Sequence, residues 1–323
     1  MTIHTTSPSA IDDQLAELLI YYATFAPSSH NTQPWRFEWD SHQIRVYADF
    51  SRWLPVADAD WREMYISVGC ALENLQLAAQ VFRYRSSITY FPDSKNHEWV
   101  ASMSLTKDPR LHDEESIELF SHIMRRRTYH HTYRARAIEE DVRERLRHWA
   151  GEVSLCLIDD SEDKRKIEQW VGQADTIQFS DPAYREELGH WIGQSAFGTP
   201  WLISKMGQWV VTHFDMGTQR SRQDATLIRQ APLLGILYTQ HNTATDRVMV
   251  GQAYERMSLG GATLGLGAQP LSQPLEVPTI KPHLASLLPD PDGHPQHLFR
   301  LGYVNQEQKP TPRRPVKEFL PDR

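Results

Sequence analysis

The chain has 323 residues, of which 40% are hydrophobic and 23% charged. Its 10 Trp, 12 Tyr and 11 Phe supply ample material for an apolar core, which excludes wholesale disorder and allows one large domain or two ordinary ones. The formal charge of −7 is dispersed along the sequence, which argues against nucleic acid or an anionic membrane as the main partner.

No window approaches 18 consecutive apolar residues, and the first residues lack a basic region followed by an apolar stretch. The two cysteines, Cys70 and Cys156, do not form a disulfide framework, and the 15 histidines lack metal-ligand spacing. We therefore expect a soluble, cytoplasmic protein with no membrane association and no metal.

The first predicted helix, Ile11–Ala23, has acidic residues in its first turn, where the helix dipole favours them. The segment Ala26–Phe37 follows and places short polar side chains between two prolines before Trp35. Proline fixes φ and removes a donor, so this run cannot continue the helix. Composition alone allows an ordinary helix-to-strand loop, or a ligand site whose amides match the edge of a planar heterocycle.

The rest of the chain alternates short strands with helices. The predicted strands are Trp35–Trp39, Ile44–Tyr47, Ile88–Tyr90, Val153–Ile158, Leu234–Tyr238 and Phe299–Tyr303. This alternation favours an α+β architecture.

A basic cluster, Arg125-Arg126-Arg127, is followed by Thr128 and His130. Guanidinium groups beside a hydroxyl suit a phosphate clamp, because arginine offers bidentate charged hydrogen bonds. A solvated basic stripe is the alternative interpretation. Arg313 and Arg314, between two prolines near the end of the chain, offer two further cations.

Two helical segments occur twice. Ile11–Ala23 resembles Ile138–Ala150 at an offset of 127 residues, and Gly69–Ala79 resembles Gly251–Gly261 at an offset of 182. Two pairs in the same order indicate an internal duplication rather than a chance likeness of amphipathic helices. We expect two homologous halves, residues 1–115 and 116–323, fused as a pseudo-dimer.

The larger second offset implies an insertion at about residues 172–229. That stretch is rich in Trp, Phe and Met and is interrupted by glycine and proline, unlike a polar linker. We expect a helical lid that covers a site or a partner surface. Beyond it, Met257–Pro270 contains four glycines, which let backbone approach a ligand or let helices pack.

Together these residues resemble the FMN-dependent nitroreductase superfamily. Ala26–Phe37, the arginine cluster with Thr128 and His130, the turn Leu264–Gln273, and Leu301–Tyr303 with Pro312-Arg313 match its motifs in order and spacing. Three further stretches resemble the fused, lidded Acg-type branch: Ser180–Trp191, Phe197-Gly-Thr-Pro200 and Gly251-Gln-Ala253.

The resemblance implies a nitroreductase-like fold with one FMN held between the halves. It implies that Arg126, Arg127 and Thr128 hold the phosphate, with Arg313 or Arg314 adding charge. His130 stands where the family pattern has Arg or Lys, and a phosphate beside it would favour the imidazolium. The ring would be bordered by Pro27, Ser28, Ser29, Asn31 and Gln33, and by the backbone of Leu271 and Ser272.

The function implied is an oxidoreductase that passes hydride from NAD(P)H through FMN to an electron-poor acceptor, a nitroaromatic or a quinone. No dedicated catalytic acid or base is expected, since the flavin carries the chemistry. Two alternatives stay open: a protein that sequesters FMN under the lid with little turnover, and a non-flavin scaffold of the same fold. An internal pseudo-dimer further predicts a monomer.

Overall fold

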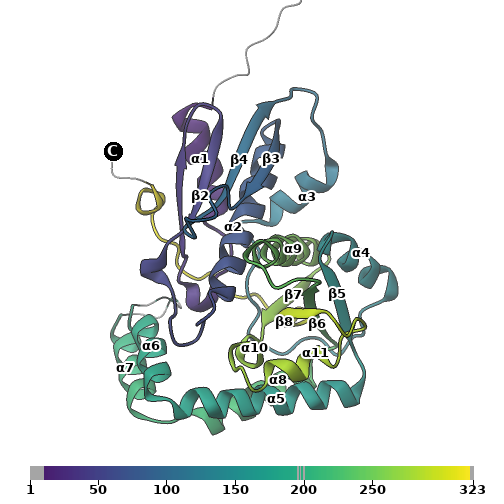
Figure 1. The fold of residues 1–323 in the computed structure, drawn as a ribbon. Helices are drawn as coiled ribbons and strands as arrows, with labels where there is room; N and C mark the ends of the chain where they lie inside the picture. The colour runs from purple at the N-terminus through teal and green to yellow at the C-terminus, as the bar shows by residue number, and fades with distance from the viewer. Residues whose placement is uncertain (1–10, 195, 197, 199–200, 321–323) are drawn as a thin grey trace, which may run out of the picture.

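The computed structural model describes residues 11–194, 196, 198 and 201–320. The chain folds into two sheet-containing halves that meet along a pair of long central helices (Figure 1). Phe197, Thr199 and Pro200, part of the lid motif named above, lie outside the described residues.

The first half is a four-stranded antiparallel sheet with helices packed on it. Its strands have the order β1-β2-β4-β3. Its elements are α1 (Asp13–Ala23), β1 (Trp35–Trp39), β2 (Gln43–Ala48), α2 (Arg62–Val81), β3 (Tyr84–Tyr90), β4 (Trp99–Lys107) and α3 (Glu114–His122), with the 3-10 turns η1 (Ser29–Asn31) and η2 (Phe50–Arg52).

The second half repeats this plan. Its antiparallel sheet has the order β5-β6-β8-β7, the same permutation of its own four strands. Its elements are α4 (Glu140–Ala150), β5 (Ser154–Ile158), α5 (Ser161–Ser180), α6 (Pro182–Gly193), α7 (Trp201–His213), α8 (Gly217–Arg229), β6 (Leu233–Thr239), α9 (Ala244–Thr263), β7 (Leu266–Pro270), α10 (Gln273–Glu276), α11 (Lys281–Ala285), β8 (His294–Tyr303) and the final 3-10 turn η3 (Val316–Phe319).

All six predicted strands are present, and the predicted α+β class is confirmed. Strands β4 and β7 were not predicted. Strand β4 carries serine and alanine at several positions, which weakens the β signal even though the strand is central in its sheet. Strand β7 contains Gly267 and ends on Pro270, residues that an edge strand tolerates.

The sequence duplication corresponds to equivalent helices. Helices α1 and α4 both have 11 residues, and α4 begins 127 positions after α1. Helices α2 and α9 both have 20 residues, and α9 begins 182 positions after α2. The offsets between the helices therefore equal those between the sequence repeats.

Helices α2 and α9 pack against each other at the centre of the molecule (Figure 1). Their contact is reciprocal: a Cβ at Gly69 would lie 2.1 Å from the Val248 carbonyl oxygen, and a Cβ at Gly251 would lie 2.0 Å from that of Ile66. Only glycine permits so close an approach of two helix backbones. At the offset of 182, Ile66 corresponds to Val248 and Gly69 to Gly251, so a pseudo-twofold axis relates α2 to α9.

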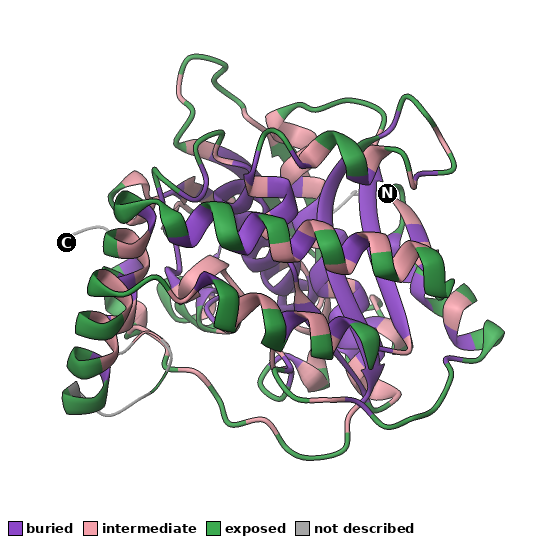
Figure 2. Ribbon diagram, turned by 90° about the horizontal axis from the view of Figure 1, so that it is seen from below, coloured by how far each residue is buried: buried purple, intermediate pink, exposed green. Residues whose placement is uncertain are grey.

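The connection between β5 and β6 contains the predicted insertion, and its described residues form α5, α6, α7 and α8 along one edge of the molecule. Helix α5 packs along α8, and α6 packs along α7 as a hairpin at the periphery (Figure 1). Figure 2 shows buried residues on the inner sides of the elements and exposed residues on the outer helices. In the described part of the chain, no helix has both the length and the apolar character to span a bilayer.

The C-terminal segment returns from the second half to the first. Phe319 in η3 is buried, and its ring lies 6.3 Å from that of Trp35 at the start of β1. This anchor brings Arg313 and Arg314 beside the polar segment that precedes β1.

Candidate functional site

Arginines from two distant parts of the chain converge on the end of α1. Arg126 Nη2 and Arg313 Nη2 both donate to the Phe25 carbonyl, at 3.3 and 3.0 Å. Arg313 Nη2 also donates to the Ala26 carbonyl at 3.3 Å. The two guanidiniums therefore meet directly before Pro27, and we name them, together with Arg127, the arginine cluster.

The arginine cluster contains more positive than negative charge. The carboxylate of Glu255 on α9 is buried, and its Oε1 lies 3.2 Å from Arg126 Nε. Burial, followed by the charges of Arg126 and Arg127, lowers the pKa of Arg313 to about 10. Burial and Arg126 likewise lower the pKa of Arg127. Because the guanidiniums destabilise one another, an added anion would be favourable here.

The polar segment after α1 is tied to this cluster through Asn31. Its Oδ1 accepts from Arg313 Nη1 at 3.2 Å, and its Nδ2 donates to the carbonyls of Ala196 and Pro312 at 2.7 and 3.0 Å. One side chain of the first half thus contacts both the insertion and the C-terminal segment.

The backbone of this segment is unusual. His30, Asn31 and Gln33 have φ values of 48°, 54° and 51°, a left-handed conformation uncommon for residues other than glycine. Ser28 stabilises the turn, since its Oγ accepts from the Gln33 N–H at 2.9 Å. Strained conformations of this kind gather at functional sites and are held by their surroundings.

Arg314 does not join the cluster. Its backbone N–H donates to Gln33 Oε1 at 3.0 Å, and its guanidinium pairs with Glu318 and lies over the ring of Phe319. These contacts fasten the tail to the polar segment, so Gln33 and Arg314 have a structural role here. Of the two predicted tail arginines, Arg313 is the one beside Arg126.

Ser29 is held from behind by a buried ion pair. Its Oγ donates to Glu63 Oε2 at 2.8 Å, and Glu63 Oε1 lies 2.5 Å from Arg62 Nη1. Burial opposes ionisation of Glu63, but Arg62 and then His297 hold its pKa below the ordinary value. The ionised carboxylate accepts the hydrogen bond of the Ser29 hydroxyl, which leaves the lone pairs of the hydroxyl oxygen available to accept from a ligand.

Thr128 and His130 lie beside β7. Thr128 forms a parallel bridge with Ala268, and His130 Nδ1 is 3.2 Å from Gln269 Nε2. The buried Arg300 on β8 fixes this arrangement. It donates to Gln269 Oε1 and to the carbonyls of Tyr129 and His131 at 2.6, 3.0 and 2.9 Å.

The ring of His130 favours its neutral form. Desolvation by the surrounding protein, then Arg220 and Arg300, lower its pKa to about 4. The side chain nevertheless keeps an exposed face at the mouth of a hollow. The imidazolium expected next to a phosphate is therefore disfavoured in the ligand-free protein.

Leu271 and Ser272 form the turn between β7 and α10. The Leu271 N–H donates to the Leu298 carbonyl at 2.8 Å, and the Leu271 side chain is buried. Ser272 is the N-cap residue of α10, and its carbonyl accepts from Leu275 and Glu276. The Leu271 N–H is already hydrogen-bonded within the sheet, so the Ser272 N–H is the candidate donor to a ligand.

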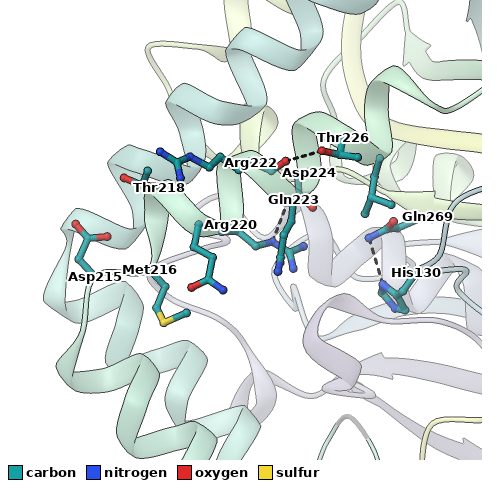
Figure 3. Close-up of a pocket in the computed structure, with 12 residues that line it drawn as sticks. His130, Asp215, Met216, Thr218, Arg220, Arg222, Gln223, Asp224, Thr226 and Gln269 are labelled. Atoms are coloured by element: carbon teal, nitrogen blue, oxygen red, sulfur yellow. Dashed lines mark hydrogen bonds and ion pairs between the residues drawn. The ribbon is translucent and has the colours of Figure 1, made fainter.

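A hollow of about 910 Å³ opens between the insertion and this turn. Figure 3 shows side chains of α8 along one wall, with His130 and Gln269 on the other. Arg220 projects from α8, and its Nε lies 2.9 Å from the buried carboxylate of Asp224. Arginine and amide groups dominate the lining, with Met216 and Leu227 as the apolar members.

Four charged residues of the site were not predicted: Glu63, Arg220, Glu255 and Arg300. The repeat carried a signal for Glu255, because it stands 182 residues after Glu73 in the duplicated helix. The others lie on elements whose position relative to the site only folding decides. Among the described residues no cluster of three or more His, Cys, Asp or Glu is arranged to hold a metal.

Comparison with known proteins reveals full-length relatives. The chain is 25% identical over 318 residues to a Mycobacterium tuberculosis protein provisionally named NAD(P)H nitroreductase Rv3131, covering 96% of this chain and 92% of the relative. The chain is thus similar over nearly its whole length to proteins named as nitroreductases. A second M. tuberculosis protein, acg, provisionally given the same activity, is 28% identical over 87 residues, or 27% of this chain. No family model matches the chain.

Solved structures of similar fold include a provisionally named nitroreductase from Anabaena variabilis. The match spans 94% of this chain and 93% of the Anabaena chain, with 11% identity and a TM-score of 0.49. A second structure is the NADPH:FMN oxidoreductase of Vibrio harveyi, complexed with NAD⁺. That match spans 62% of this chain and 74% of the Vibrio chain, with 13% identity and a TM-score of 0.41. The assignment to the fused Acg-type branch stays a prediction.

Proposed function

We propose that the chain is an FMN-dependent NAD(P)H oxidoreductase of nitroreductase type. The observation that carries this proposal is the arginine cluster beside the polar segment of the first half. The guanidiniums of Arg126 and Arg313 lie near one buried carboxylate, that of Glu255, at a point where both halves and the C-terminal segment meet. The full-length relative named as an NAD(P)H nitroreductase supports the same activity.

The residues present fit an FMN phosphate. Arg313 Nε is a buried donor for which no hydrogen-bond partner occurs among the described residues. A phosphate offers several acceptor oxygens and two negative charges, which would offset the mutual repulsion of Arg126, Arg127 and Arg313. Glu255 would hold Arg126 in place, and Asn31 would do the same for Arg313.

The ring would lie between the polar segment and the turn before α10. Ser29 and Asn31, next to Pro27 and Ser28, would supply polar atoms on one side, and Ser272 a backbone N–H on the other. A donor at that position would stabilise negative charge on the reduced ring. When bound, FMN would supply hydride transfer, chemistry that protein side chains lack.

The hollow beside α8 would receive the donor and then the acceptor. Its Arg220 and Gln269 can hydrogen-bond the oxygens of a nitroaromatic or a quinone, and Met216 and Leu227 offer apolar contact to a flat ring. Neutral His130, at the rim, adds no charge at neutral pH. No side chain has to act as acid or base in this scheme.

Replacing Arg313 tests the phosphate site. Arg313→Gln should weaken FMN binding by roughly tenfold to a hundredfold, because a charge-assisted contact is worth about 1.5–3 kcal/mol. Riboflavin lacks the phosphate, so its binding should change little. The measurement is titration of ligand-free protein with each flavin, followed by the quenching of flavin fluorescence.

The matched control is Arg125→Gln. Arg125 belongs to the same triplet but its side chain is exposed, and its loss should leave both affinities unchanged. Equal weakening in the two variants would mean that general surface charge, rather than the cluster, attracts the flavin. Failure of the wild-type protein to bind FMN at all would refute the proposed function.

Catalysis needs its own assay, in which NADPH oxidation is followed with a nitroaromatic or a quinone present. The rival function is storage of FMN under the insertion, and the bond from Asn31 to Ala196 favours it, since this contact ties the insertion to the polar segment. Gly217 lies against Phe179, so a short linker can replace residues 182–216. Turnover that appears only after this deletion would favour storage, and turnover by the intact chain favours the enzyme.

A further inference from the structure

The outer face of α7 is an apolar stripe. Its exposed side chains recur at helical spacing, and Leu202, Met206 and Trp209 are 65%, 64% and 56% exposed. Ile203, Val210 and Phe214 extend the stripe along the same helix and just beyond it. We estimate the exposed area of these six side chains at roughly 700 Å², more than the largest apolar patch on a typical monomer.

The inner face of α7 is mostly polar, the reverse of the usual arrangement. Ser204 is buried, and Gln208 and Thr212 face the glycines of α6. A Cβ at Gly189 would lie 2.4 Å from Thr212 Oγ1, and one at Gly193 would lie 2.1 Å from Gln208 Oε1. A surface helix normally turns its apolar side to the core. The inverted pattern indicates that the outer stripe is a contact surface for another molecule.

The stripe is separate from the proposed flavin site. The hollow is lined by residues 215–227 of the insertion together with His130 and Gln269, and it includes no residue of the stripe. A small-molecule substrate therefore does not explain these side chains. The cover has to be a macromolecular surface or a lipid.

The charges favour another copy of the chain over a membrane. From Leu188 to Phe214 the sequence has no Asp or Glu, and Lys205 is its one lysine or arginine. Helices that lie on lipid carry many lysines or arginines on their polar face, whereas the polar face of α7 is packed against α6 and the chain has a charge of −7. Two nearly uncharged stripes can meet without like-charge repulsion.

We propose that the α7 stripe is the self-association surface of a twofold symmetric dimer, in place of the monomer that the internal pseudo-dimer predicts. The stripes of two copies would pack face to face, with each α6 on the outside, as in a four-helix bundle. Such a contact would bury about 1,400 Å² in total, within the 1,200–2,000 Å² typical of a specific interface. Because α8 follows α7 after three residues, the dimer would also hold the α8 wall of the hollow.

Sedimentation velocity over a concentration series up to about 100 µM tests this surface. The mass derived from the sedimentation of the wild-type protein should be twice the chain mass of 37.4 kDa. Trp209→Glu should raise the dissociation constant of the dimer at least tenfold. The matched control is Ile117→Glu on α3, a position 40% exposed, which should leave the dimer intact. Circular dichroism would establish that each variant is folded.

Met206→Lys serves as a second variant if Trp209→Glu does not fold. A monomeric wild-type protein across the series overturns the proposal, as does a dimer that survives both changes on α7. Flotation with phosphatidylglycerol vesicles provides the competing outcome, and wild-type binding to vesicles that Trp209→Glu abolishes would assign the stripe to lipid. None of these readouts depends on FMN.

Discussion

Asp175 and Asp224 form a buried pair of carboxyl groups where α5 and α8 meet α10. Gln273 Nε2 donates to Asp175 Oδ1 at 3.2 Å and to Asp224 Oδ2 at 3.0 Å, and Arg220 lies 2.9 Å from Asp224. Burial, followed by the charge of Asp224, raises the pKa of Asp175 to about 7. Arg220 and Gln273 oppose this shift without cancelling it. Three elements, α5, α8 and α10, are therefore joined through the side-chain amide of Gln273.

This pair makes stability depend on pH in a defined direction. In the unfolded chain Asp175 loses its proton near its ordinary pKa of 3.8, whereas in the folded protein it keeps the proton up to about pH 7. Between these values the unfolded state binds fewer protons, so the free energy of unfolding falls as pH rises. Asp175→Asn keeps the oxygen that accepts from Gln273 and removes the titration.

The free energy of unfolding of Asp175→Asn, measured relative to wild type, should increase by roughly 1–3 kcal/mol when the pH is raised from 5 to 8. Urea unfolding at the two pH values measures this. Asp292→Asn, at an exposed turn, is the control and should show the same small difference at both pH values. A constant difference for Asp175→Asn would show that its carboxyl group titrates normally.

At the scale of elements, the central contact of α2 with α9 depends on Gly69 and Gly251. The two helix backbones approach so closely that a methyl group on either glycine would meet a carbonyl oxygen of the other helix. Backbone cannot move aside as a flexible side chain can, so the cost would fall on the packing of both halves.

Gly251→Ala should therefore lower the free energy of unfolding by about 2–4 kcal/mol. Gly261 on the same helix is the matched control, because a Cβ there would meet Leu266 Cβ at 3.5 Å, an ordinary contact. Gly261→Ala should be neutral or stabilise by about 0.5–1 kcal/mol through helix propensity. Similar denaturation midpoints for the two variants would contradict the close-packing interpretation.

For the whole molecule, the duplication explains why one flavin site is expected rather than two. Glu73 is the counterpart of Glu255 in the first half, and Glu255 lies 3.2 Å from Arg126. Glu73 is paired instead with Arg256 of α9, at 2.7 Å. The second, symmetry-related position is thus occupied by an ion pair within the protein.

We predict one FMN per chain at saturation. Flavin released from the gel-filtered complex and measured by absorbance, against protein measured by amino-acid analysis, gives the ratio. Arg256→Gln should leave the ratio at one, whereas the double variant Arg126→Gln, Arg313→Gln should reduce bound flavin severely. Two FMN per chain would refute the single-site inference.

Much of the architecture could be predicted, because local patterns survive folding. The repeats determine equivalent helices, hydrophobic alternation determined six strands, and the arginine run pointed to an anion site. Strand β7 was missed because Gly267 and Pro270 carry no β signal, although the edge of the sheet accepts them.

The sequence by itself determined the duplicated plan and the α+β class, and it predicted the residue types of a phosphate site. Only the tertiary structure decided which side chains meet. It brought Arg313 rather than Arg314 to Arg126, supplied Glu255 as the buried counter-charge, and committed the Leu271 amide to β8. It also turned the apolar side of α7 outward. These outcomes depend on contacts between residues that are distant in the chain, or on which face of a helix packs against a neighbour. The local sequence encodes neither.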